Sequence, residues 1–102
     1  MNIVIEQLIV EKSRYKHIAK HHVKVSEARE VIDENYVYIK GRENKLLLIG
    51  KTKAGRFLTV VIGSRRKKGV YGLVTARPAS REERSFYREF VLQTVGEQNG
   101  KN

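Results

Sequence analysis

Residues 36–77 read YVYIKGRENKLLLIGKTKAGRFLTVVIGSRRKKGVYGLVTAR, and this stretch decides the fold. It holds four segments rich in β-branched and aromatic residues, each expected to form a strand: 36–41, 45–52, 56–63 and 70–77. Short polar turns join them, two of which contain Gly55 and Gly69. Consecutive strands with such short connections predict an antiparallel meander, because parallel strands need a long crossover. Pro78 ends the last strand, since proline has no N–H to donate, and it holds Arg77 extended.

Helical patterns flank the four strands on both sides. Residues 2–10 fit a short strand, and two helices follow. Ser13 is the candidate N-cap of the first helix, and Ser26 opens the second. After the strands, Ser80 and Glu83 form a capping box that begins a helix running to about Val95. We therefore predict an α+β domain. A meander of about four antiparallel strands is packed by two N-terminal helices and one C-terminal helix. Residues 1–95 form this single domain, and residues 96–102 form a flexible C-terminal tail.

The composition points to a polyanionic partner. The chain has 102 residues with 21 Lys and Arg against 11 Asp and Glu, which gives a net charge of +10. Nucleic acid leads the possible partners, followed by an anionic membrane surface or an acidic protein. The absence of cysteine excludes disulfides and thiolate chemistry. The chain also lacks an apolar run of the roughly 20 residues that a membrane span needs, so we expect a cytoplasmic protein.

Several cations are expected to meet at one edge of the sheet. In a meander the end of one strand lies beside the start of the next, which brings Lys51, Arg56 and Arg77 together. The C-terminal helix adds Arg81 to the same edge. Arginine presents a planar fork of donors that suits phosphate oxygens. The alternative is that these are solvated charges that protect strand ends.

Other candidate residues have two interpretations each. The basic turn containing Arg65 contacts a phosphate backbone or is a solvated hairpin tip. Tyr71 and Tyr87 stack on bases or belong to the core. The pattern HxxxHH, residues 17–22, has the spacing of a metal pair but lacks a third ligand, so no metal site is predicted. His22 suits a left-handed position at the end of the first helix. The chain has no nucleotide-binding glycine motif, and we predict no cofactor.

Three segments, taken in order, resemble the BrnT-like toxins of type II toxin–antitoxin systems. AKHHVKVSEAREVI resembles their KHGVS-x-EEA-x-x-V segment, and IGKTKAGRFLTVVI is similar to their IG(R)T-x-x-GR-x-L-x-VV strand pair. TARPASREERSFY is similar to their S/T-A-R-x-A-[ST]-x-x-E-R-x-x-Y ending. The resemblance covers residues 3–90. This chain departs from the pattern at His22, where glycine is usual, at residues 8–10, where a Trp-Asp pair is usual, and at Pro78.

The resemblance implies a RelE-like fold and a ribonuclease toxin that cuts RNA without metal. The ribose 2′-oxygen would attack the adjacent phosphate and leave a 2′,3′-cyclic end. The implied partners are RNA, including mRNA on ribosomes, and a cognate antitoxin with a DNA-binding domain.

The resemblance also suggests site residues. Arg56 and Arg77 match the family's GR and AR positions, and Lys51 lies where it can assist them. The remaining candidates for holding RNA are Arg65, Arg81, Arg84, Arg88 and Tyr71. Arginine cannot act as a base at ordinary pH, so the proton shuttle stays open among Tyr87, Tyr71, Lys51 and His21. Two other functions stay open as well: a non-enzymatic nucleic-acid-binding regulator, and a basic module that receives an acidic protein partner.

Overall fold

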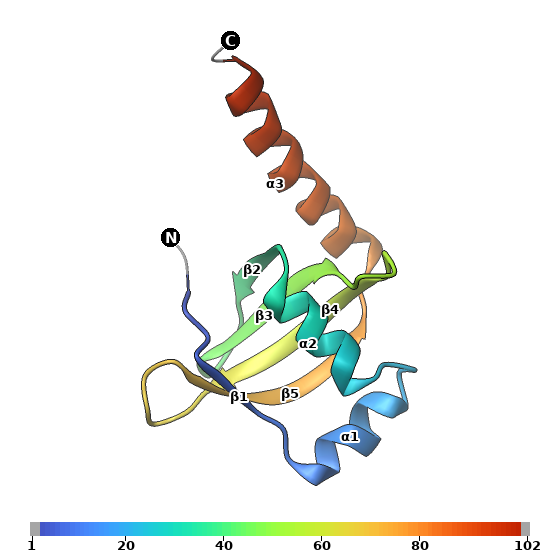
Figure 1. The fold of residues 1–102 in the computed structure, drawn as a ribbon, viewed down its shortest axis with the longest axis vertical. Helices are drawn as coiled ribbons and strands as arrows, with labels where there is room; N and C mark the ends of the chain where they lie inside the picture. Colours follow the sequence, from blue (N-terminus) through green and yellow to red (C-terminus); the bar gives the residue numbers. More distant parts are fainter. Residues whose placement is uncertain (1–2, 101–102) are drawn as a thin grey trace.

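A computed structural model describes residues 3–100 of the chain, and side chains from residue 3 to residue 91. It has five strands in one sheet, ordered β1-β5-β4-β3-β2, and three helices (Figure 1). Their bounds are β1 Gln7–Ile9, α1 Lys12–Ala19, α2 Val25–Asp33, β2 Tyr36–Lys40, β3 Lys45–Lys51, β4 Phe57–Ser64, β5 Val70–Pro78 and α3 Arg81–Gly100.

The predicted meander is confirmed. Strands β2, β3, β4 and β5 pair in succession and antiparallel, with Lys51 opposite Phe57 and Thr59 opposite Arg77. Gly55 and Gly69 adopt φ values of 88° and 83° in their turns, a conformation that costs glycine little. The short N-terminal strand expected over residues 2–10 is also present, but only Gln7–Ile9 form it. It adds a fifth strand to the sheet by pairing parallel with β5, which the meander prediction did not specify.

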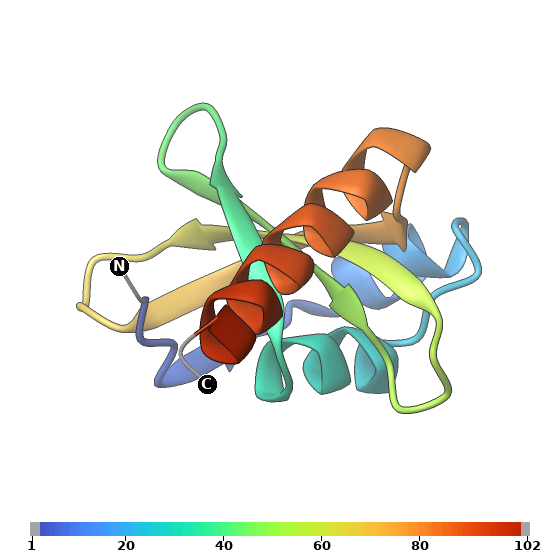
Figure 2. The same cartoon turned by 90° about the horizontal axis from the view of Figure 1, so that it is seen from above.

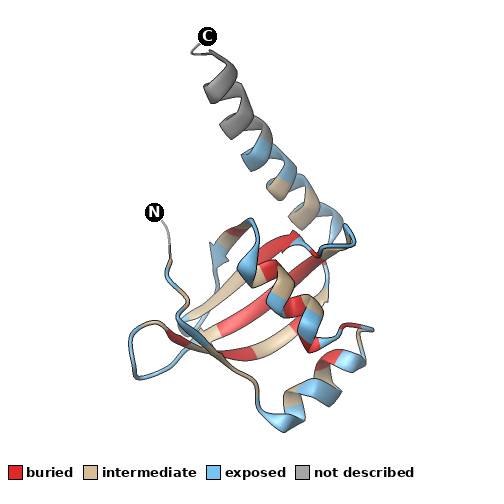
Figure 3. Cartoon of the chain, viewed as in Figure 1, coloured by how far each residue is buried: buried red, intermediate tan, exposed pale blue. Residues whose placement is uncertain are grey.

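Two cores lie on opposite faces of the sheet. The larger one buries Leu48, Leu58 and Val60 beneath the two N-terminal helices. The smaller one joins Val37, Ile49 and Ala79 on the face that α3 covers. Neighbouring residues such as Leu48 and Ile49 point to opposite faces because side chains alternate along a strand. Figure 2 shows α2 and α3 on opposite sides of the strands, and Figure 3 shows the buried residues concentrated in the sheet and the helix faces against it.

The helix starts differ in part from the prediction. The capping box of α3 is confirmed: Ser80 Oγ accepts from the Glu83 N–H at 3.1 Å, and the Glu83 carboxylate accepts from the Ser80 N–H at 2.8 Å. Ser13 and Ser26 lie inside α1 and α2 instead of before them. At α2 the decisive group is Glu27, whose carboxylate accepts the Lys24 N–H at 3.0 Å. A carboxylate in the first turn satisfies an unpaired donor as well as a serine does.

The C-terminal ends of α1 and α3 can also be compared with the prediction. α1 closes with His22 at φ 60°, as its sequence position suggested, and the Val23 N–H reaches back to the Ile18 carbonyl at 3.2 Å. This is a Schellman-type end, and its two apolar residues, Ile18 and Val23, are both buried. α3 continues to Gly100, past the predicted end at Val95, so the predicted tail begins inside this helix. No helix in the described part of the chain is long and apolar enough to cross a membrane.

Candidate functional site

Arg77 lies in a network of polar contacts on the α3 face of the sheet. Its two terminal nitrogens donate to the two carboxylate oxygens of Glu83, each at 2.8 Å. Glu83 also accepts from the Thr59 hydroxyl at 2.7 Å. Thr59 is fully buried on β4, directly opposite Arg77 on β5. The network therefore joins two strands to the first turn of α3.

The charges in this network are stable across ordinary pH. Hydrogen bonds from Arg77, helped by those from Ser80 and Thr59, lower the pKa of Glu83 from 4.5 to about 2, although burial opposes the change. The same pair raises the pKa of Arg77. A fixed cation and a fixed anion therefore coexist at this end of the sheet.

A second cluster surrounds the ring of Phe57 on the same face. The Lys51 ammonium lies 5.1 Å from the ring centre, and the Arg88 guanidinium carbon lies 5.5 Å from it. The Tyr87 ring meets the Phe57 ring edge to face at 5.4 Å. Cations at these distances are attracted to the ring electrons, so Lys51 and Arg88 each interact with Phe57.

An open pocket of about 370 Å³ adjoins this cluster. It lies between the start of β2, the β3–β4 turn and α3, and its lining includes Lys51 and Tyr87. Glu34 and Lys53 also line this pocket. The pocket thus combines positive charge, a phenol and a carboxylate. These are the groups needed to bind a phosphate and move protons around it.

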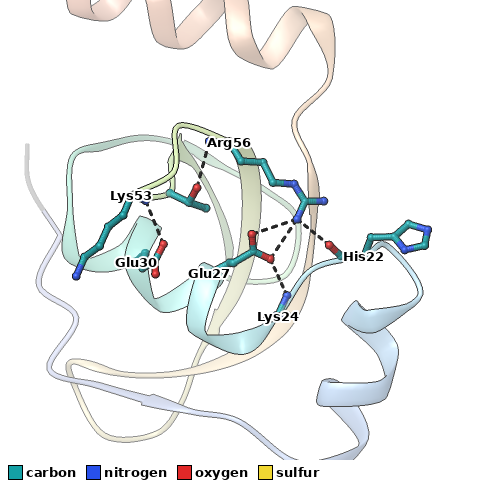
Figure 4. Close-up of polar contacts among 7 residues, drawn as sticks. His22, Lys24, Glu27, Glu30, Lys53 and Arg56 are labelled. Atoms are coloured by element: carbon teal, nitrogen blue, oxygen red, sulfur yellow. Dashed lines mark hydrogen bonds and ion pairs between the residues drawn. The ribbon is translucent and has the colours of Figure 1, made fainter.

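Arg56 lies on the other face of the sheet (Figure 4). One of its terminal nitrogens donates to the His22 carbonyl at 2.7 Å and to both oxygens of Glu27, at 3.1 and 3.2 Å. The Lys24 N–H and then Arg56 lower the pKa of Glu27. Arg56 therefore ties the α1–α2 connection to the start of β4.

The expected cluster of Lys51, Arg56 and Arg77 is therefore corrected. All three residues lie at the same end of their strands, as the meander requires. Their side chains divide between the two faces, however, because Arg56 precedes Phe57 and consecutive side chains in extended chain point opposite ways. Lys51 and Arg77 lie on the α3 face with Tyr87 and Arg88.

The remaining predicted residues lie elsewhere. Arg65 is at the far end of the sheet, where it pairs with Glu11 at 3.7 Å. Tyr71 packs against the larger core. At the start of α3, Arg81 is exposed and Arg84 is half-buried. The His21 ring contacts the His17 ring at 5.8 Å, and the described residues contain no group of three potential metal ligands.

Three residues of this site were not singled out from the sequence: Glu34, Phe57 and Glu83. Glu83 was recognised as a helix cap, a local role that its spacing from Ser80 signals. Its bonds to Arg77 and Thr59 depend on how α3 returns to the sheet. The strand pattern of residues 56–63 indicated that Phe57 belongs to a strand. It did not indicate that two cations lie over the Phe57 ring.

Among solved structures, the chain is similar to the crystal structure of the Brucella abortus ribonuclease toxin, BrnT. The two share 15% sequence identity with a TM-score of 0.59, over 74% of this chain and 97% of that one. At this identity the likeness shows the fold, which is BrnT-like. No protein-family model matches the sequence, and no curated protein does.

Proposed function

We propose that this chain is a ribonuclease toxin of a type II toxin–antitoxin system, which cleaves RNA without a metal ion. One observation carries the proposal. Four residues expected at such a site, Lys51, Arg77, Tyr87 and Arg88, lie on one face of a fold shared with a ribonuclease toxin. The net charge of +10 supports RNA as the substrate, including mRNA on ribosomes.

The chemistry needs charge stabilisation and two proton transfers. The 2′-hydroxyl loses its proton, its oxygen attacks phosphorus, the bond from phosphorus to the 5′-oxygen breaks, and that oxygen takes up a proton. Negative charge gathers on the phosphate oxygens in the transition state, where Arg77 and Lys51 stabilise it. Glu34 and Tyr87 line the pocket beside Lys51, so the first would accept the proton and the second would donate one. Arg88 holds a neighbouring phosphate.

The partner that belongs with this activity is an antitoxin protein with a DNA-binding domain. A free toxin with this charge would bind an acidic antitoxin segment through complementary charge, and both would act in the cytoplasm. Co-expression with the product of a neighbouring short reading frame tests this. A stable complex that no longer cuts RNA is the expected outcome.

The activity is tested by incubating the purified protein with RNA in EDTA and analysing the new ends. Cleavage that persists in EDTA and leaves 2′,3′-cyclic phosphates is expected. Free RNA and ribosome-bound RNA are both used as substrates. Intact RNA in both assays would overturn the proposal.

The main alternative is a non-enzymatic regulator that binds nucleic acid. A specific observation favours it: Arg56 and Arg77 are both already paired with carboxylates. This alternative predicts salt-sensitive RNA binding with an intact substrate and no growth arrest on expression. A basic module that binds only an acidic protein would show neither RNA binding nor cleavage.

A further inference from the structure

We infer that Glu83 is a positioning residue: it holds the guanidinium of Arg77 in one orientation for the RNA phosphate. The inference rests on the proposed function, and it assigns to Glu83 a role beyond capping α3. Its basis is the set of contacts that the two carboxylate oxygens make.

The two oxygens of Glu83 have different tasks. Oε1 accepts from the Thr59 hydroxyl at 2.7 Å, from the Ser80 N–H at 2.8 Å and from Arg77 Nη1 at 2.8 Å. Oε2 accepts from Arg77 Nη2 at 2.8 Å. The first oxygen therefore fixes the carboxylate to β4 and to the helix start. The second oxygen completes the two-point grip on Arg77.

The anchor of this grip cannot shift easily. Thr59 is fully buried on β4, the central strand of the sheet, and the Glu83 side chain is only 13% exposed. A carboxylate held from two elements is a rigid reference, and a bidentate pair fixes the plane of the guanidinium. Without Glu83, Arg77 would sample several rotamers, and their ordering would have to occur when RNA binds.

Arg77 keeps donors for a substrate despite this pair. A guanidinium has five N–H groups, and Glu83 accepts two of them. A third contact, to the Pro78 carbonyl, is long at 3.4 Å. The Arg77 side chain is 35% exposed, so solvent and a phosphate can reach the donors that remain. The pair therefore orients Arg77 and leaves it able to bind RNA.

One substitution separates this role from helix capping. In Glu83→Gln the amide oxygen can replace Oε1 and keep the contacts with Thr59 and Ser80. The amide nitrogen then replaces Oε2 and meets Arg77 Nη2, donor against donor, while the amide oxygen can still accept from Arg77 Nη1. The substitution therefore removes the negative charge and the second point of the grip on Arg77, and it keeps the helix cap. Glu82→Gln is the matched control, because Glu82 is exposed in the same first turn and the charge change is equal.

The experiment measures RNA cleavage by the full chain under single-turnover conditions. Glu83→Gln should lower the maximal rate about 10- to 100-fold with little change in the RNA concentration needed for half-saturation. Glu82→Gln should cut at the wild-type rate. When Arg77 is already alanine, adding Glu83→Gln should cause no further loss, because there is no guanidinium left to orient. A purely structural Glu83 would lower the rate in both backgrounds, and that result would overturn the inference.

A second readout does not need activity. Restricted rotation of the Arg77 guanidinium, seen as separate Nη signals by NMR, should be present in the wild type and lost in Glu83→Gln. If the wild type shows this restriction but cuts no RNA, the proposed function fails while the orientation of Arg77 stands. If the wild type cuts RNA and Glu83→Gln is unimpaired, the positioning role fails alone.

Discussion

The two arginines expected at the site have different surroundings, which allows a direct test of which face reacts. Arg77 shares the α3 face with Lys51 and Tyr87, whereas Arg56 binds α2 and the preceding turn. We expect Arg77→Ala to lower RNA cleavage by two orders of magnitude or more, roughly the loss seen on removing one charge-stabilising donor. Arg56→Ala should mainly lower stability, by about 1 kcal/mol, because its ion pair is partly exposed.

Cleavage assays and urea unfolding of Arg77→Ala and Arg56→Ala decide which face of the sheet carries the reaction. Circular dichroism of each variant serves as the control for folding. If Arg56→Ala abolishes cleavage while its unfolding curve is unchanged, the reaction takes place on the α2 face instead.

The low pKa of Glu83 predicts how acid affects stability. The pKa is about 2 in the folded chain and 4.5 in the reference state, so the ionised form stabilises the fold. That contribution is complete above pH 4.5 and is lost as the pH falls from 4.5 towards 2. Its size is at most on the order of 3 kcal/mol, and less because Arg77 is partly exposed.

Unfolding of the wild type and of Glu83→Gln should therefore be compared across this range. At about pH 7 the wild type should be the more stable protein, and the difference should shrink towards about pH 3. Glu82→Gln controls for the removal of one surface charge. A gap between wild type and Glu83→Gln that stays constant with pH would contradict the prediction.

At the scale of elements, the end of α1 stores conformational strain at one residue. His22 adopts φ 60°, a region that costs a residue with a Cβ atom more than it costs glycine. We expect His22→Gly to raise the free energy of unfolding by about 0.5–1 kcal/mol, since glycine relieves this strain but is more flexible when unfolded. The backbone carbonyl that binds Arg56 is unaffected by the substitution.

His21→Gly is the matched control for this prediction. His21 is not among the residues with positive φ in the described chain, so glycine there should only lower stability. Thermal unfolding of the two variants beside the wild type gives the comparison. If both glycines destabilise the protein to the same extent, the left-handed geometry at position 22 carries no strain.

At the scale of the molecule, the net charge of +10 predicts that RNA affinity falls steeply with salt. The logarithm of the binding constant should fall linearly with the logarithm of salt concentration, by about 0.7 per phosphate contacted on a single strand. The turn that holds Arg66 and Lys67 lies at the opposite end of the sheet from Arg77. Arg66→Gln with Lys67→Gln therefore tests whether RNA extends that far.

If RNA reaches this turn, the double variant should reduce the salt slope by about one to two units and leave the maximal cleavage rate unchanged. Fluorescence anisotropy with a labelled RNA strand measures the slope. A slope equal to that of the wild type would confine the RNA to the α3 end of the sheet.

Much of the backbone could be predicted because its signals are local. Segments of β-branched residues separated by short turns specify the meander, and Gly55 and Gly69 mark turns that need a positive φ. The Ser80–Glu83 box marks the start of α3 for the same reason: its two hydrogen bonds join residues three apart. The pairing of β1 with β5 could not be predicted, since three residues carry too little pattern to choose a neighbour.

By itself, the sequence determined that the chain is a basic α+β domain, with cations gathered at one end of a meander. Only the tertiary structure decided which face each cation occupies and which acid accompanies it. Arg56 and Arg77 both lie at the same end of the sheet, yet Arg56 binds Glu27 whereas Arg77 binds Glu83. The physical reason is that a strand's side chains alternate between two faces, and the helix above each face supplies the partner carboxylate. Spacing along the chain does not encode which helix covers which face.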